Sequence, residues 1–130
     1  MARRVLPYLA LVALMSALSA CSIYERPKRP AWRAAAENAC FAEKRVRVSA
    51  YVQPASEISG PGICGLTRPL HVTALQGGAV RLNSRSTLDC SMVAELDDWV
   101  ANTLQPAAKA RFGQPVVQIN TMGAYACRGM

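Results

Sequence analysis

The stretch 88–104, LDCSMVAELDDWVANTL, decides the fold of this chain, because it holds the clearest helical pattern in the sequence. Its apolar side chains recur at spacings of three and four residues, which places them on one face of a helix. That face comprises Leu88, Met92, Leu96, Trp99 and Thr103 or Leu104. Ser86 is placed to cap the N-terminus, and Pro106 is expected to end or kink the helix. Met92 and Trp99 are therefore expected in the core.

Two further helical stretches are expected on either side of this one. Residues 107–112 predict a second helical segment after Pro106, and Gly113 stands in the usual place after a helix C-terminus. Upstream, the alanine-rich residues 34–41 favour one short helix.

The expected strands are short. Apolar residues alternate with Arg45, Arg47, Ser49 and Tyr51 over residues 45–52, a period of two that predicts a half-buried strand stopped by Pro54. Residues 70–75 and 79–82 predict two strands joined by Gln76-Gly77-Gly78, a plausible hairpin connection. Residues 116–119 are a final strand candidate.

Four of the five cysteines lie in the body of the chain, at Cys40, Cys64, Cys90 and Cys127. An even number without a C-x-x-C pair predicts two disulfides in an oxidising compartment rather than a zinc or redox site. Three connectivities are open. Cys40 with Cys64 and Cys90 with Cys127 is favoured, because the first bond joins neighbouring segments and leaves the second pair to close the C-terminal half. A domain this small buries little core and is expected to need both bonds.

The N-terminus carries the parts of a secretory signal. Arg3 and Arg4 precede an apolar run over residues 5–18, which is shorter than the roughly 20 residues of a membrane-spanning helix. The run leads into Leu18-Ser19-Ala20-Cys21, which resembles the bacterial lipobox, where the cysteine thiol receives a diacylglyceryl group before the signal is removed. Cys21 is therefore expected to begin the mature chain and to anchor it in a membrane. The alternative is that residues 5–20 form an ordinary cleaved signal or a membrane anchor, with Cys21 incidental. A cleaved signal would leave the product secreted into the periplasm, and the shortness of the run counts against the anchor.

Ser22 bears on which membrane is reached. Aspartate, the usual inner-membrane retention residue at this position, is absent, so the chain resembles outer-membrane lipoproteins that face the periplasm. Residues 22–33 hold two prolines and four basic residues, which predicts an extended tether.

The basic excess is expected to serve the envelope rather than nucleic acid. The formal net charge is +7, and removal of Arg3 and Arg4 leaves 13 basic residues against 8 acidic ones, a net charge of +5. An exported lipoprotein rarely meets nucleic acid. The charges favour anionic lipid or lipopolysaccharide phosphates as neighbours, or a solvated basic face without a partner.

Several segments together carry a resemblance to a known family. They are Cys64-Gly65, Leu88-Asp89-Cys90, the helix with Trp99, Gln105-Pro106-Ala107-Ala108, Phe112-Gly113 and Tyr125-Ala126-Cys127-Arg128. In this order and spacing they resemble the bacterial extensin-like C-terminal domain family over residues 38–130. That family is similar to zinc D-alanyl-D-alanine carboxypeptidases of the cell wall, whose fold is a small α+β domain with an antiparallel sheet.

The resemblance and the expected elements together imply an α+β fold: a small disulfide-stabilised domain with a short antiparallel sheet and one main amphipathic helix. The chain then divides into a lipoprotein signal peptide at 1–20, the lipidated cysteine and basic tether at 21–37, and an extensin-like domain at 38–130. The resemblance also implies that this domain is incomplete at its C-terminal end, since the metal-binding motif of the related peptidases follows the segment that matches Cys127-Arg128.

A zinc site is not expected from the residues at hand. Catalytic zinc ordinarily takes about three protein ligands, and the sequence has one histidine, His71, inside a strand pattern. No catalytic or metal-binding residue is assigned, and zinc would enter only with the missing motif. Arg128 matches the arginine that binds the substrate's terminal carboxylate in the related peptidases, although an exposed terminal arginine is the alternative. Tyr125 also matches the family pattern, but packing beside Cys127 is reason enough for it.

Three hypotheses for function follow. The first is a lipid-anchored cell-envelope protein with an extensin-like domain that is associated with peptidoglycan and non-catalytic in this form. The second is that the sequence forms the N-terminal part of a longer zinc-dependent murein peptidase. The third is a non-catalytic binding module for peptidoglycan or an envelope partner.

Overall fold

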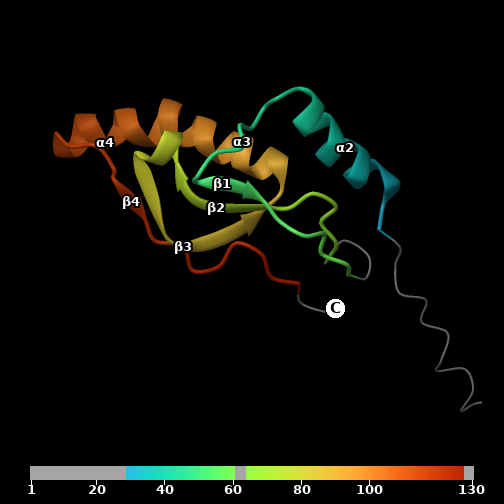
Figure 1. The fold of residues 1–130 in the computed structure, drawn as a ribbon. Coiled ribbons are helices and arrows are strands. Elements are labelled where there is room, and N and C mark those ends of the chain that lie inside the picture. Colours follow the sequence, from blue (N-terminus) through green and yellow to red (C-terminus); the bar gives the residue numbers. More distant parts are fainter. Residues whose placement is uncertain (1–28, 61–63, 128–130) are drawn as a thin grey trace, which may run out of the picture.

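The computed structural model describes residues 29–60 and 64–127. In chain order the elements are α2 (Ala31–Ala42), β1 (Val52–Pro54), β2 (Leu70–Leu75), the 3-10 turn η4 (Gln76–Gly78), β3 (Val80–Leu88), α3 (Cys90–Trp99), the π-helical turn η5 (Val100–Leu104), α4 (Gln105–Phe112) and β4 (Gln118–Ile119). In Figure 1, α3 and α4 lie along one side of the sheet, and α2 lies beyond the start of α3. The expected small, disulfide-stabilised α+β fold is confirmed.

The sheet has four strands in the order β1-β2-β3-β4. The pairs β1–β2 and β2–β3 are antiparallel, as expected, whereas β4 runs parallel to β3 through the pairs Arg81 with Gln118 and Leu82 with Ile119. The sheet is therefore mixed. The reason is that the helices after β3 carry the chain back to the end where β3 begins, so the next strand runs in the same direction as β3.

The β2–β3 hairpin is the longest pairing in the sheet. β2 has the predicted bounds, and the predicted link Gln76-Gly77-Gly78 forms the turn, with φ of 65° at Gly77 and 105° at Gly78. β3 continues beyond the predicted 79–82 to Leu88, which pairs with Leu70. The sequence did not predict this extension, because residues 83–85 are polar and do not alternate with apolar residues. They are exposed, and they lie opposite an irregularity in the β2–β3 register between Val72 and Ala74.

Residues 90–112 form one continuous helical run. Asp89 caps it, since Oδ1 of Asp89 accepts a hydrogen bond from the N–H of Met92 at 2.7 Å. The prediction of Ser86 as the cap is wrong, because β3 still includes that residue. Pro106 does not end the helix but stands in the first turn of α4, directly after η5. A wider turn accommodates the ring and the missing N–H of proline. Gly113 ends the run with φ of 69°, as predicted.

The core lies between the sheet and this helical run. Its buried residues include Leu70, Val72, Leu75 and Val80 from the hairpin and Cys90, Val93 and Val100 from the helix. Met92 and Trp99 are 53% and 47% exposed, so the prediction that they lie in the core is wrong. Cys90, Val93 and Val100 lie on the helix face that packs against the sheet, so they set the rotation of the helix about its axis.

The predicted strand over residues 45–52 is also wrong for most of its length. Only Val52 to Pro54 pair with β2, and Val48 is 59% exposed. The Ser49 hydroxyl accepts hydrogen bonds from the N–H groups of Tyr51 and Val52, each at 3.2 Å. This local turn competes with strand pairing. Pro54 ends β1 at the sheet edge, where its missing N–H costs little.

The helix α2 is longer than the predicted 34–41 and begins within the residues assigned to the tether.

The Gln105 side chain fixes the backbone just before β4 by two hydrogen bonds. Its Nε2 donates to the Val116 carbonyl at 2.8 Å, and its Oε1 accepts from the Val116 N–H at 2.9 Å.

Candidate functional site

Two residues that the sequence singles out, Cys21 and Arg128, lie outside the described residues. Tyr125 is described and is partly exposed. Tyr125 precedes Cys127 by two residues, and its hydroxyl donates a hydrogen bond to the backbone carbonyl of Cys64, the disulfide partner of Cys127. Tyr125 therefore supports the disulfide that joins these two segments.

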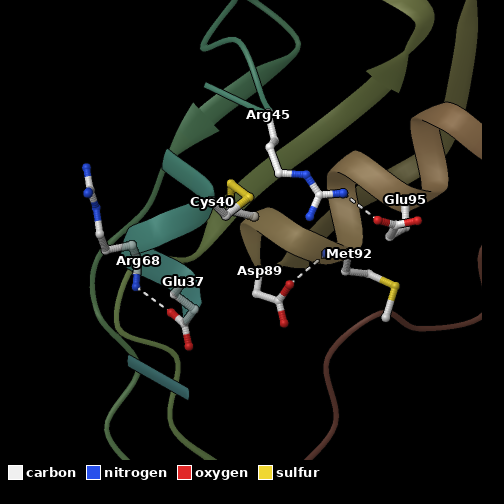
Figure 2. Close-up of a disulfide and its surroundings, with 8 residues drawn as sticks. Glu37, Cys40, Arg45, Arg68, Asp89, Met92 and Glu95 are labelled. Atoms are coloured by element: carbon white, nitrogen blue, oxygen red, sulfur yellow. Dashed lines mark hydrogen bonds and ion pairs between the residues drawn. A yellow bond between two sulfur atoms is a disulfide. The ribbon is translucent and has the colours of Figure 1, made fainter. Parts of the chain in front are cut away.

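All four cysteines of the body form disulfides, as expected, but the favoured pairing is wrong. Cys40 bonds to Cys90 and Cys64 to Cys127, with Cα–Cα distances of 6.0 Å and 5.4 Å. The reason lies in the hairpin: β3 returns to the end of the sheet where β2 begins, so Cys90 arrives beside Cys40 of α2. Figure 2 shows the surroundings of this disulfide at Cys40. Cys64 is left to bond with the segment that follows β4.

His71 lies in β2, and its Nδ1 is 3.3 Å from the Thr87 hydroxyl on β3. It is half-buried and has a hydrogen-bond partner, as expected for a strand histidine. In residues 29–60 and 64–127, no three His, Cys, Asp or Glu side chains gather where they could hold a metal ion. The described residues therefore do not offer the set of about three protein ligands that a catalytic zinc ion ordinarily takes.

A buried polar network, not expected from the sequence, joins α2 to the segment before β2. Glu37 is 5% exposed and forms an ion pair with Arg29. Its Oε2 accepts hydrogen bonds from the N–H groups of Thr67 at 2.8 Å and Arg68 at 2.9 Å. Arg29 also donates to the Thr67 hydroxyl at 2.7 Å. The network satisfies the carboxylate and fixes α2 against the loop, which is a structural role.

A pocket of about 570 Å³ opens between the loop after α2 and the helix α3. We call it the loop–helix pocket. Its charged and aromatic lining is Lys44, Arg45, Arg47, Tyr51, Asp97 and Asp98. The volume falls within the range of roughly 300–1,000 Å³ that is common for small-molecule sites.

Contacts within the lining order two sides of the pocket. Arg45 forms an ion pair with Glu95 and so connects the loop to α3 (Figure 2). Asp97 Oδ1 accepts from the Gln76 N–H, and Gln76 Nε2 donates to the Asp97 carbonyl, both at 2.7 Å. Asp98 Oδ1 accepts from Asn102 Nδ2 at 2.8 Å. The carboxylates are therefore held by the hairpin and by the helix itself.

Gly78 allows Tyr51 to lie against the hairpin at the edge of the pocket. A Cβ atom added at Gly78 would come within 2.5 Å of Cε2 in the Tyr51 ring. The missing Cβ leaves room for this ring, and the φ of 105° at Gly78 favours glycine.

The sequence did not predict this pocket, because the pattern over residues 45–52 predicted a strand with its basic side chains on the solvent-facing side. The signals were the basic cluster at 44–47 and the acidic pair at 97–98, which lie far apart in the chain. Only the fold brings them to one cavity.

No helix in the described part of the chain has the length and apolar composition needed to cross a membrane. A family model described as "Extensin-like protein C-terminus" matches residues 38–130. Comparison with curated proteins and with solved structures found no match.

Proposed function

The chain belongs to the extensin-like protein C-terminus family, and from that premise we propose that it is a lipid-anchored cell-envelope protein that associates with peptidoglycan without catalysis. The lipid would be carried by Cys21, and the protein would face the periplasm from the outer membrane. The described domain begins at residue 29, which leaves residues 22–28 between the lipidated cysteine and the domain.

One observation supports the anchor above the others. The two disulfides use four of the five cysteines, so Cys21 is the one cysteine outside these bonds. A free thiol in an oxidising compartment is a liability, because it exchanges with disulfides. A thioether to lipid removes that thiol, and two or three acyl chains give stable membrane attachment.

Replacement of Cys21 tests the anchor. We expect Cys21→Ala to abolish acylation, so that fatty-acid labelling and the membrane-extracted mature form are both lost. Ser19→Ala, which keeps a small residue before the cysteine, is the matched control and should retain both. Ser22→Asp should keep acylation but move the protein from the outer to the inner membrane fraction. Acylation that persists in Cys21→Ala would refute the anchor.

The peptidoglycan part needs its own test. Detergent-extracted protein mixed with purified sacculi should sediment with them, and sacculi digested to soluble fragments should release it. Protein that stays in the supernatant would contradict peptidoglycan association while leaving the anchor intact.

A second candidate is that this domain works within a longer zinc-dependent murein peptidase. The family model matches residues 38–130, and the resemblance of its motifs to zinc carboxypeptidases of the cell wall motivates this candidate. Because the described residues do not fit zinc, the ligands would have to come from additional sequence. The intact mass of the membrane-extracted protein separates the candidates: a mass above that of acylated 21–130 favours the peptidase.

A further inference from the structure

The loop–helix pocket offers charges of both signs to a ligand. Arg45 is neutralised by Glu95. The side chains of Lys44 and Arg47 form no ion pair or hydrogen bond with the described residues. Asp97 and Asp98 each accept one hydrogen bond at Oδ1, and their Oδ2 atoms accept none from the described residues. Two cations and two carboxylates therefore remain available in one cavity.

The loop after α2 and the helix α3 come into direct contact beside the pocket. The guanidinium of Arg45, on the loop, already reaches a carboxylate on α3, as Figure 2 shows. A small ligand with a positive charge at one end and a negative charge at the other would likewise connect the loop to α3. Val46, Tyr51 and Ala101 supply apolar surface for the carbon atoms of such a ligand.

The charge balance decides the class of ligand. A purely anionic ligand such as phosphate would meet the two carboxylates as well as the cations, and like charges repel. A purely apolar ligand would bury charged groups without partners, which is costly. A ligand with one ammonium and one carboxylate pairs with both sides.

We propose that the loop–helix pocket binds an amino-acid centre that carries a free ammonium and a free carboxylate. The carboxylate would pair with Arg47 and Lys44, and the ammonium with Asp97 and Asp98. The inference rests on the proposed function, because the diaminopimelate side chain of a peptidoglycan stem peptide ends in such a centre. The pocket would then recognise stem peptides that are not cross-linked through that amine.

The test is calorimetric titration of the detergent-extracted full chain with the tripeptide L-alanyl-γ-D-glutamyl-meso-diaminopimelate. Two modified tripeptides serve as ligand controls: one acetylated at the side-chain amine and one amidated at the side-chain carboxylate. We expect saturable binding of the unmodified peptide and a loss of about tenfold in affinity for each modified peptide, as expected when one charged hydrogen-bonded contact is removed.

Variants locate the site. Arg47→Gln and Asp98→Asn should each weaken binding by about tenfold. Asn at position 98 keeps an acceptor for Asn102, so the helix is preserved. Arg85→Gln and Glu57→Gln make the same charge changes at exposed positions outside the pocket lining and should leave affinity unchanged.

Each outcome bears on the pocket separately from the proposed function. Absence of tripeptide binding, equal binding of all three peptides, or unchanged affinity in both pocket variants would overturn the inference. If sacculi still sediment the protein in that case, peptidoglycan association stands and uses another surface. Tripeptide binding that needs both charges and Arg47 supports the pocket even if intact sacculi fail to retain the protein.

Discussion

The two disulfides close loops of similar length but hold very different parts of the molecule. They span 50 residues between Cys40 and Cys90 and 63 residues between Cys64 and Cys127. Loop-closure entropy alone assigns each about 4 kcal/mol. Yet Cys40 and Cys90 are 3% and 0% exposed within the core, whereas Cys127 lies in the exposed segment that follows β4. We call them the core disulfide and the surface disulfide.

The comparison teaches that equal loops do not imply equal stabilisation. A crosslink reduces the entropy of the unfolded chain, but its removal also lets the folded chain move. The core disulfide is surrounded by packed residues that allow no such movement. The segment at 121–127 is held mainly by Thr121, whose N–H donates to Asn83 Oδ1 at 2.7 Å, and by the Tyr125 hydroxyl. It can loosen without disturbing the core.

The largest effect should come from breaking the core disulfide. The double variant Cys40→Ala with Cys90→Ala loses the crosslink and leaves a cavity between α2 and α3, so we expect a loss of about 5 kcal/mol in the free energy of unfolding. This is at least a third of the free energy of unfolding of a typical domain, which is roughly 5–15 kcal/mol. Urea unfolding followed by circular dichroism measures it. A loss no greater than that of the surface-disulfide variant would contradict the comparison.

The next largest effect should come from breaking the polar network around Glu37, which joins α2 to the segment before β2. Glu37→Gln keeps the shape but removes the charge that pairs with Arg29, whose side chain is 19% exposed. We expect a loss of about 3 kcal/mol, because an unpaired and largely buried guanidinium remains. Glu43→Gln, at the exposed C-cap position directly after α2, is the control and should change stability little. Equal unfolding midpoints for the two variants would show that the network does not stabilise the fold.

The smallest effect should follow loss of the surface disulfide. For Cys64→Ala with Cys127→Ala we expect about 1 kcal/mol, because the freed segment regains motion in the folded state. Hydrogen exchange gives the sharper measurement: amides at 121–127 should exchange faster, while those of β2 keep their protection. Faster exchange throughout β2 would mean that the surface disulfide also holds the core.

Much of the fold followed from local pattern. β2, its glycine turn, the helix over 90–104 and the cap at Gly113 were predictable because each depends on neighbouring residues. The rotation of the helix was not, since Val93 and Val100 compete with Met92 and Trp99 and only the sheet decides between them. The alternation at 45–52 failed for a similar reason: the Ser49 turn outweighs a period of two.

The candidate site was less accessible to sequence reasoning than the fold. The types of residue that bind charged ligands were visible at 44–47 and 97–98, but their meeting depends on long-range packing. The partner of each cysteine depended on it too. Cys40 and Cys64 are consecutive cysteines in the sequence, yet the hairpin brings Cys90 to Cys40.

The order of these bonds along the chain bears on biogenesis. The two loops interleave, since Cys64 lies between Cys40 and Cys90, and Cys90 lies between Cys64 and Cys127. If the chain is exported N-terminus first, as proposed, it presents Cys40 and Cys64 to the oxidising machinery before either native partner has crossed. Rapid oxidation at that stage joins the wrong pair. Production of the correctly bonded protein is therefore expected to depend on a disulfide isomerase, and not on an oxidase alone.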